Sequence, residues 1–110
     1  MRQYVIDELS FLERDNIESY LKRTLKPGPM EGIFWLELPR DLWSEAQQGH
    51  EKCAPFYIGV VLEEKALKFE FLVRNSDNMH CSCIARTTPT QRQFVLDFAD
   101  RLLEEEMVSA

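Results

Sequence analysis

The chain has 110 residues, of which 45% are hydrophobic and 29% are charged, and its formal net charge at pH 7 is −6. This composition suits one globular domain spanning residues 1–110 and argues against disorder. Lys and Arg residues are dispersed, and nucleic-acid affinity depends on clustered cations that displace counterions from phosphates. We therefore expect neither nucleic acid nor an anionic membrane surface as a partner.

The N-terminal stretch carries Asp7 and Glu8 where a signal peptide would have its apolar run. No run of about 18 apolar residues occurs, so a membrane-spanning helix is not expected. These features predict a cytoplasmic protein. The chain has three cysteines, an odd number that cannot all pair within one molecule. In a reducing compartment they are expected to be thiols or metal ligands rather than disulfides.

The first predicted elements are a strand over Gln3–Leu9 and a helix within residues 10–25. The helix is indicated by an apolar stripe at spacings of three and four residues, formed by Ile17, Tyr20, Leu21 and Leu25. Its start is ambiguous, because Ser10 with Glu13 and Asp15 with Glu18 both fit a capping box. Pro27 should end the helix, since proline disfavours helical geometry in the residue before it.

A second strand is predicted over Ile33–Leu38 and is closed by Pro39. The connection over residues 39–55 follows, with one or two helical turns expected around Ser44–Gln48 and Gly49 able to end them.

Three further strands are expected before the last helix. Residues 56–63 are apolar on both sides, which is typical of a central strand. Residues 66–74 alternate apolar and polar side chains with a period of two, so one face is covered and one is wetter. The two form a hairpin through Glu64 and Lys65. After an Asn- and Ser-rich turn, residues 79–86 are the fifth strand. The final helix begins at Thr88, which has capping-box spacing to Gln91, and its buried stripe is Phe94, Val95, Phe98 and Leu102.

This order, β-α-β-β-β-β-α, predicts an α+β fold with a five-stranded antiparallel sheet and two helices on one face. The layout resembles that of TATA-binding-protein-like and helix-grip domains in topology alone. Fold does not fix function, so the resemblance assigns none.

The sheet face opposite the helices is expected to be more apolar than a wetted face requires. It would present Ile33, Trp35, Tyr57, Val61 and Leu72. A contiguous exposed apolar patch usually marks an interface, and the commonest version is a homodimer. Two alternatives remain open: another protein partner, or coverage of this face by the 39–55 connection through Leu42 and Trp43. The interface hypothesis, preferred here, describes a small non-catalytic binding or assembly domain.

The cysteines and histidines form a second candidate site. Cys81 and Cys83 would point to the same side of the fifth strand. The third and fifth strands of a meander run parallel, so Cys53 and His50, just before the third strand, would lie at the same sheet edge. These four residues form a thiolate and imidazole set that suits zinc. His80 would point the other way and is a weaker candidate.

Two other hypotheses apply to the same residues. Cysteine often behaves as a small buried apolar residue, so all three could be inert core, and in that case no cofactor is needed. Alternatively, Cys53 or Cys83 could be a nucleophile activated by His50 or His80. No third orienting residue is evident, and we expect a non-catalytic protein.

Overall fold

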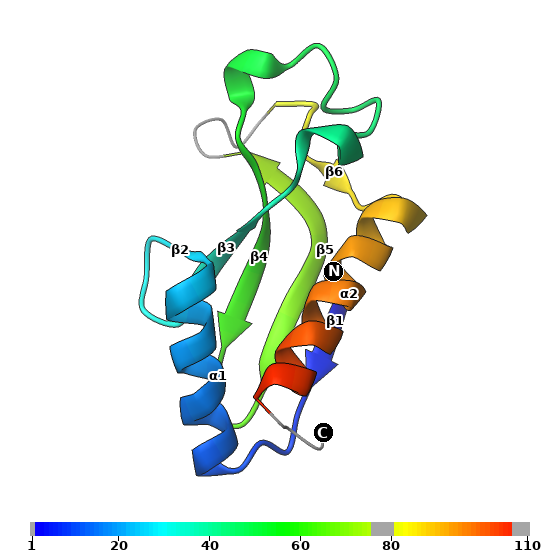
Figure 1. Cartoon of the computed structure of the whole chain (residues 1–110). Coiled ribbons are helices and arrows are strands. Elements are labelled where there is room, and N and C mark those ends of the chain that lie inside the picture. The colour runs from blue at the N-terminus through cyan, green and yellow to red at the C-terminus, as the bar shows by residue number, and fades with distance from the viewer. Residues whose placement is uncertain (1, 76–80, 107–110) are drawn as a thin grey trace.

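The computed structural model describes residues 2–75 and 81–106, and it has the predicted α+β architecture. An antiparallel sheet of six strands has the order β1-β5-β4-β3-β2, with β6 also paired to β5. Helices α1 and α2 both lie on one face of this sheet (Figure 1). The bounds of the strands are β1 Gln3–Ile6, β2 Lys26–Pro27, β3 Ile33–Glu37, β4 Phe56–Leu62, β5 Leu67–Asn75 and β6 Ala85–Arg86.

Strands β3, β4 and β5 form the predicted meander, and β1 joins it at the β5 edge. The β4–β5 hairpin closes where Leu62 faces Leu67. Strand β2 was not predicted, because its two residues lie in the segment that the prolines mark as a turn. Lys26 and Pro27 pair with Trp35 and Phe34 at the edge of the sheet, where a proline without a donor is tolerated.

The predicted fifth strand is largely wrong. Its first two residues, 79 and 80, lie outside the described residues. Cys81–Ile84 then form a turn in which the Ile84 backbone N–H donates to the Cys81 carbonyl over 3.1 Å. Of its described residues, only Ala85 and Arg86 pair with β5, as strand β6. The alternation expected for Cys81 and Cys83 on a strand therefore does not occur.

Helix α1 (Phe11–Thr24) starts at the first of its two predicted caps. Ser10 accepts from the Glu13 backbone and the Glu13 side chain accepts from the Ser10 backbone, so two free amides at the helix end are satisfied. Helix α2 (Pro89–Glu105) begins in the same way, with a capping box between Thr88 and Gln91. No helix among the described residues is long and apolar enough to cross a membrane.

The core lies between the sheet and the two helices. Its helical side is formed by the predicted stripes, including Ile17 and Leu21 from α1 and Val95 and Leu102 from α2, all fully buried. Its sheet side comes from alternate residues of β4 and β5, among them Phe56, Ile58, Val60, Leu67, Phe69 and Val73. Since this layer is continuous, the helices and sheet form one core.

The 39–55 connection contains the 3₁₀ turns η1 (Arg40–Leu42) and η2 (Glu51–Cys53), with hydrogen-bonded turns between them. It lies at the end of the molecule beyond the N-terminal end of α2 (Figure 1). Leu42 and Trp43 pack against the core, and the Trp43 ring meets the Phe56 ring edge-on at 4.8 Å. Leu42 and Trp43 therefore pack on the helix side of the sheet, and the alternative in which they cover the opposite face does not hold.

Candidate metal centre

Four side chains converge where the connection meets the turn that follows β5. The metal-binding atoms of His50, Cys53, Cys81 and Cys83 all lie within 4.8 Å of one another. Cys81 Sγ lies 3.6 Å from Cys53 Sγ and 3.4 Å from His50 Nδ1. The four residues that the sequence proposed are therefore together. His80, the weaker candidate, lies outside the described residues.

The connection delivers His50 and Cys53 through two tight turns. Gly49 has a φ of +82°, a left-handed conformation that glycine adopts without steric cost. The chain then enters η2, where the Cys53 backbone N–H donates to the His50 carbonyl over 2.9 Å. This single turn places the side chains of His50 and Cys53 on the same side of the chain, as expected for residues one helical turn apart.

The second pair comes from the Cys81–Ile84 turn at the start of β6. Cys83 is fully buried and belongs to the core, whereas Cys81 and Cys53 are partly exposed and pack against it. The site therefore lies at the boundary between core and surface. Cys83 is a core residue, and His50, Cys53 and Cys81 are partly exposed. The core and ligand hypotheses for Cys83 are compatible.

The distances suit a single metal ion. Bonds of about 2.3 Å to sulfur and about 2.0 Å to nitrogen in a tetrahedral site place neighbouring ligand atoms about 3.5–3.8 Å apart. The distances of 3.6 Å and 3.4 Å are within about 0.2 Å of that range. The group could therefore hold one metal ion after small side-chain movements.

The three thiols differ in pKa. The hydrogen bond with Cys81, followed by burial, raises the pKa of Cys53 to about 11. Hydrogen bonds from the Cys83 side chain and backbone lower the pKa of Cys81 to about 7. Burial raises the pKa of Cys83. A thiol nucleophile needs a lowered pKa, so the two cysteines named for that role, Cys53 and Cys83, are poorly suited to it.

Three buried or half-buried amides next to the site were missed by sequence reasoning. Asn75 donates to Cys83 Sγ over 3.2 Å, and Gln47 donates to the Cys83 carbonyl over 2.7 Å. Gln91 donates to Gln47 over 3.0 Å. The sequence around these residues showed turn and capping patterns, which indicate neither the contact of Asn75 with Cys83 eight positions away nor the contacts of Gln47 and Gln91 with residues 36 and 44 positions away.

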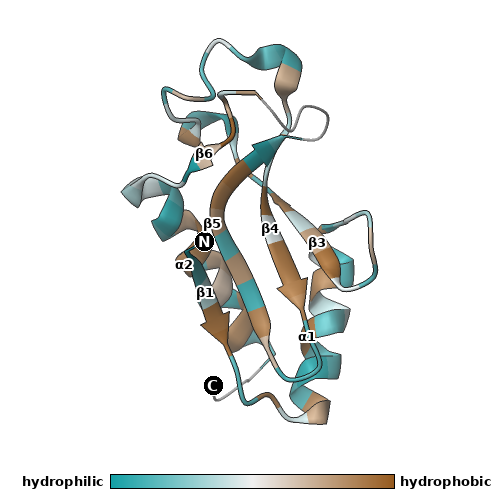
Figure 2. Ribbon diagram, turned by 180° about the vertical axis from the view of Figure 1, so that it is seen from behind, coloured by the Kyte–Doolittle hydropathy of each residue, from teal (hydrophilic) through white to brown (hydrophobic). Residues whose placement is uncertain are grey.

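The predicted interface residues lie on the sheet face opposite the helices, which Figure 2 shows with both helices behind the sheet. The rings of Trp35 and Tyr57 are 5.6 Å apart. Val61 pairs with Ile33 across β3 and β4. Leu72 lies apart from them, on β5 beside β6. Tyr57 is buried by its neighbours, and the other residues of the set are partly exposed.

Comparison with protein-family models, with curated proteins and with solved structures returned no match to this chain. Function is therefore argued from the geometry of the molecule itself.

Proposed function

We propose that this chain is a zinc-stabilised domain whose ion is held by His50, Cys53, Cys81 and Cys83 and has a structural role. The observation that carries the proposal is the convergence of four metal-binding atoms within 4.8 Å of one another, from two separate loops. Soft thiolates with one imidazole favour zinc over magnesium or calcium, which prefer oxygen ligands.

A structural role follows from the number of ligands. Four protein ligands complete a tetrahedral zinc site, whereas catalytic zinc sites keep one position for water or substrate. Cys83 is fully buried, so the ion would be closed off on that side.

The loops that supply the ligands have a physical need for such a link. The connection from residue 39 to residue 55 contains two short 3₁₀ turns and no longer regular element. A loop of this length is uncommon in a compact domain unless something fixes it. One ion would join it to the turn before β6, across a sequence separation of 28 residues between Cys53 and Cys81.

Elemental analysis tests the proposal most directly. Untagged protein purified without chelator should contain about one zinc per chain, and its thiols should react only after unfolding or metal removal. His50→Asn should abolish stoichiometric zinc, and His80→Asn is the matched control that should retain it. Wild-type protein that is purified without metal and does not bind added zinc would contradict the proposal and favour the core interpretation of the cysteines.

A second candidate function is self-association through the face around Trp35, Tyr57, Val61 and Leu72. It is favoured by the position of the connection, which packs on the helix side of the sheet. Among the described residues no helix lies over this face (Figure 2). The preferred occupant is a second copy of the chain, in a symmetric dimer.

Charge supports a second copy on this face. The chain as a whole has a net charge of −6, which disfavours contact between most parts of two copies. On this face Glu70 pairs with Arg74 at 3.1 Å, and Lys68 pairs with Glu63 at 3.0 Å. Two copies could therefore meet here with little repulsion.

Sedimentation of the wild type and of Trp35→Glu tests the dimer. A concentration-dependent dimer in the wild type that is lost in the variant is the expected result. Gln93→Glu, at an exposed position of α2 away from this face, adds the same charge and is the control. A wild type that stays monomeric at all concentrations would contradict this candidate.

A further inference from the structure

Two glutamines beside the proposed zinc site are fully buried, Gln47 and Gln91. Glutamine is mostly exposed in proteins, and burying its amide costs free energy unless its polar atoms are hydrogen-bonded. The partners of these two amides therefore indicate what they do. The inference drawn from them rests on the proposed zinc site.

Gln47 holds the backbone at a zinc ligand. Its Oε1 accepts hydrogen bonds from the Ser44 backbone N–H over 2.9 Å and from the Ser44 hydroxyl over 2.7 Å. Its Nε2 donates to the Cys83 carbonyl over 2.7 Å. A backbone N–H can only donate and a carbonyl can only accept, so these partners fix which way the amide points. Gln47 thus ties the connection to Cys83 directly.

Gln91, in helix α2, holds the Gln47 side chain in place. Its Oε1 accepts from the Thr88 backbone as part of the helix cap, over 2.9 Å. Its Nε2 donates to the Leu42 carbonyl over 2.9 Å and to Gln47 Oε1 over 3.0 Å. A continuous path of buried hydrogen bonds therefore runs from the start of α2 to the backbone of Cys83. Rigid elements such as helices position ligands more precisely than loops do.

Asn75 reaches the same ligand from the end of β5. Its Nδ2 donates to Cys83 Sγ over 3.2 Å. An N–H bond to a metal-bound sulfur orients the ligand and tunes its electron donation to the metal. Cys83 is therefore held by an amide at its sulfur and by another at its carbonyl.

We propose that Gln47 and Asn75 are positioning residues for the zinc site: Gln47 fixes the backbone of Cys83, Asn75 fixes its sulfur, and the bond from Gln91 to Gln47 couples metal binding to the start of α2. Outer partners of this kind typically change metal affinity by about 10–100-fold when they are replaced. The same range is expected here.

The test measures zinc affinity of the full chain by competition with a chromogenic chelator. Gln47→Glu keeps the length of the side chain but replaces the donor to the Cys83 carbonyl with an acceptor, and we expect about 10–100-fold weaker binding. Gln48→Glu is the matched control. It makes the same change at an exposed neighbouring residue, whose side chain donates to the Trp43 carbonyl over 3.3 Å. This variant should keep its zinc affinity within about twofold of the wild type.

A spectroscopic readout separates positioning from a general role in folding. With Co²⁺ in place of zinc, Asn75→Asp should shift the sulfur-to-metal charge-transfer absorption, because the N–H donor to Cys83 is lost. A residue that served folding alone would lower stability without moving this absorption in metal-saturated protein. If Gln47→Glu does not fold, Gln47→Met, which removes the same bonds without adding charge, is measured in its place.

The outcomes distinguish this inference from the proposed function. Wild type that binds zinc, together with variants of unchanged affinity and unchanged Co²⁺ spectrum, would overturn the inference and leave the zinc site standing. Wild type that binds neither metal would overturn both. Weaker binding with a shifted spectrum, in variants whose metal-free forms keep wild-type secondary structure, is the expected result.

Discussion

Removal of zinc should destabilise the domain by several kcal/mol. The ion would link the connection to the turn before β6. Among the described residues, the hydrogen bond from Gln47 to the Cys83 carbonyl also links these two segments, and the connection's large apolar residues Leu42 and Trp43 are only partly buried. A ligand that binds only the folded state stabilises it by about 2.7 kcal/mol at a hundred times its dissociation constant and about 4.1 kcal/mol at a thousand times.

These free energies convert into a measurable temperature shift. Unfolding entropy is about 2.1 cal/mol/K per residue near 60 °C, so a chain of 110 residues has about 230 cal/mol/K. Dividing the loss of stabilisation by this unfolding entropy gives a fall in Tm of about 12–18 °C when zinc is removed. The assay is thermal unfolding followed by circular dichroism, before and after treatment with a chelator and again after zinc is restored.

The control for this assay is Cys81→Ala, which removes a ligand at the centre of the cluster. Its Tm should already be close to that of metal-free wild type, and the chelator should not lower it further. An unchanged wild-type Tm after verified zinc removal would refute the reasoning. So would a Cys81→Ala protein that keeps the full response to chelator.

The remaining predictions concern protons, the core and one turn. At pH 7 zinc binding should release between two and three protons from the thiols, because Cys53 and Cys83 have raised pKa values and Cys81 one of about 7. Zinc affinity should therefore fall as pH is lowered, and calorimetry in buffers of different ionisation enthalpy counts the protons. Leu102→Ala, in the fully buried core, should cost about 2–5 kcal/mol in urea unfolding without changing zinc content. Gly49→Ala, where φ is +82° and nothing meets the new methyl group, should cost about 1–2 kcal/mol from backbone strain alone.

The elements whose signals are local could be predicted from the sequence. Thr88 caps the final helix as expected, because its capping box lies within four residues. Where two local signals competed, the sequence left the choice open: Ser10 caps α1, and Asp15, the other candidate, lies within the helix. Strand β2 was missed because its two residues form a strand only by pairing with β3, a tertiary event that propensity does not encode.

The candidate site was predicted by a partly incorrect route. Cys81 and Cys83 were placed together by strand alternation, but they lie in a turn whose sharp change of direction brings both toward Cys53. The part of the reasoning that held was topological. Strands β4 and β6 both run antiparallel to β5, so the residues before each of them meet at one end of the sheet. Connectivity therefore predicted the site better than local geometry did.

From the sequence, the cysteines could be either buried core residues or metal ligands. Cys83 shows that these two roles are compatible. Its side chain is fully buried within the core cluster, while its sulfur lies in the same group as His50, Cys53 and Cys81. A metal bound there would join the connection to a turn whose Cys83 side chain is itself part of the packed core. Gln47 strengthens that attachment, since it donates a hydrogen bond to the backbone of the same cysteine.

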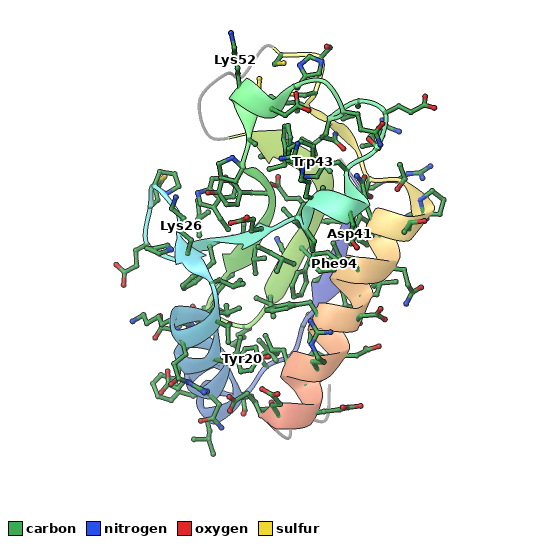
Figure 3. All side chains as sticks on the ribbon, turned by 45° about the horizontal axis from the view of Figure 1, so that its top comes forward. Tyr20, Lys26, Asp41, Trp43, Lys52 and Phe94 are labelled. Atoms are coloured by element: carbon green, nitrogen blue, oxygen red, sulfur yellow. The ribbon has the colours of Figure 1, made fainter. Side chains whose placement is uncertain are left out.

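Lys52 and Trp43 lie at the same end of the molecule as the proposed zinc site, far from Tyr20 between the helices at the other end (Figure 3). Because the metal ligands lie at this end, zinc loss should open the connection locally before it affects α1, and hydrogen exchange that became faster in α1 than in the connection would contradict this expectation.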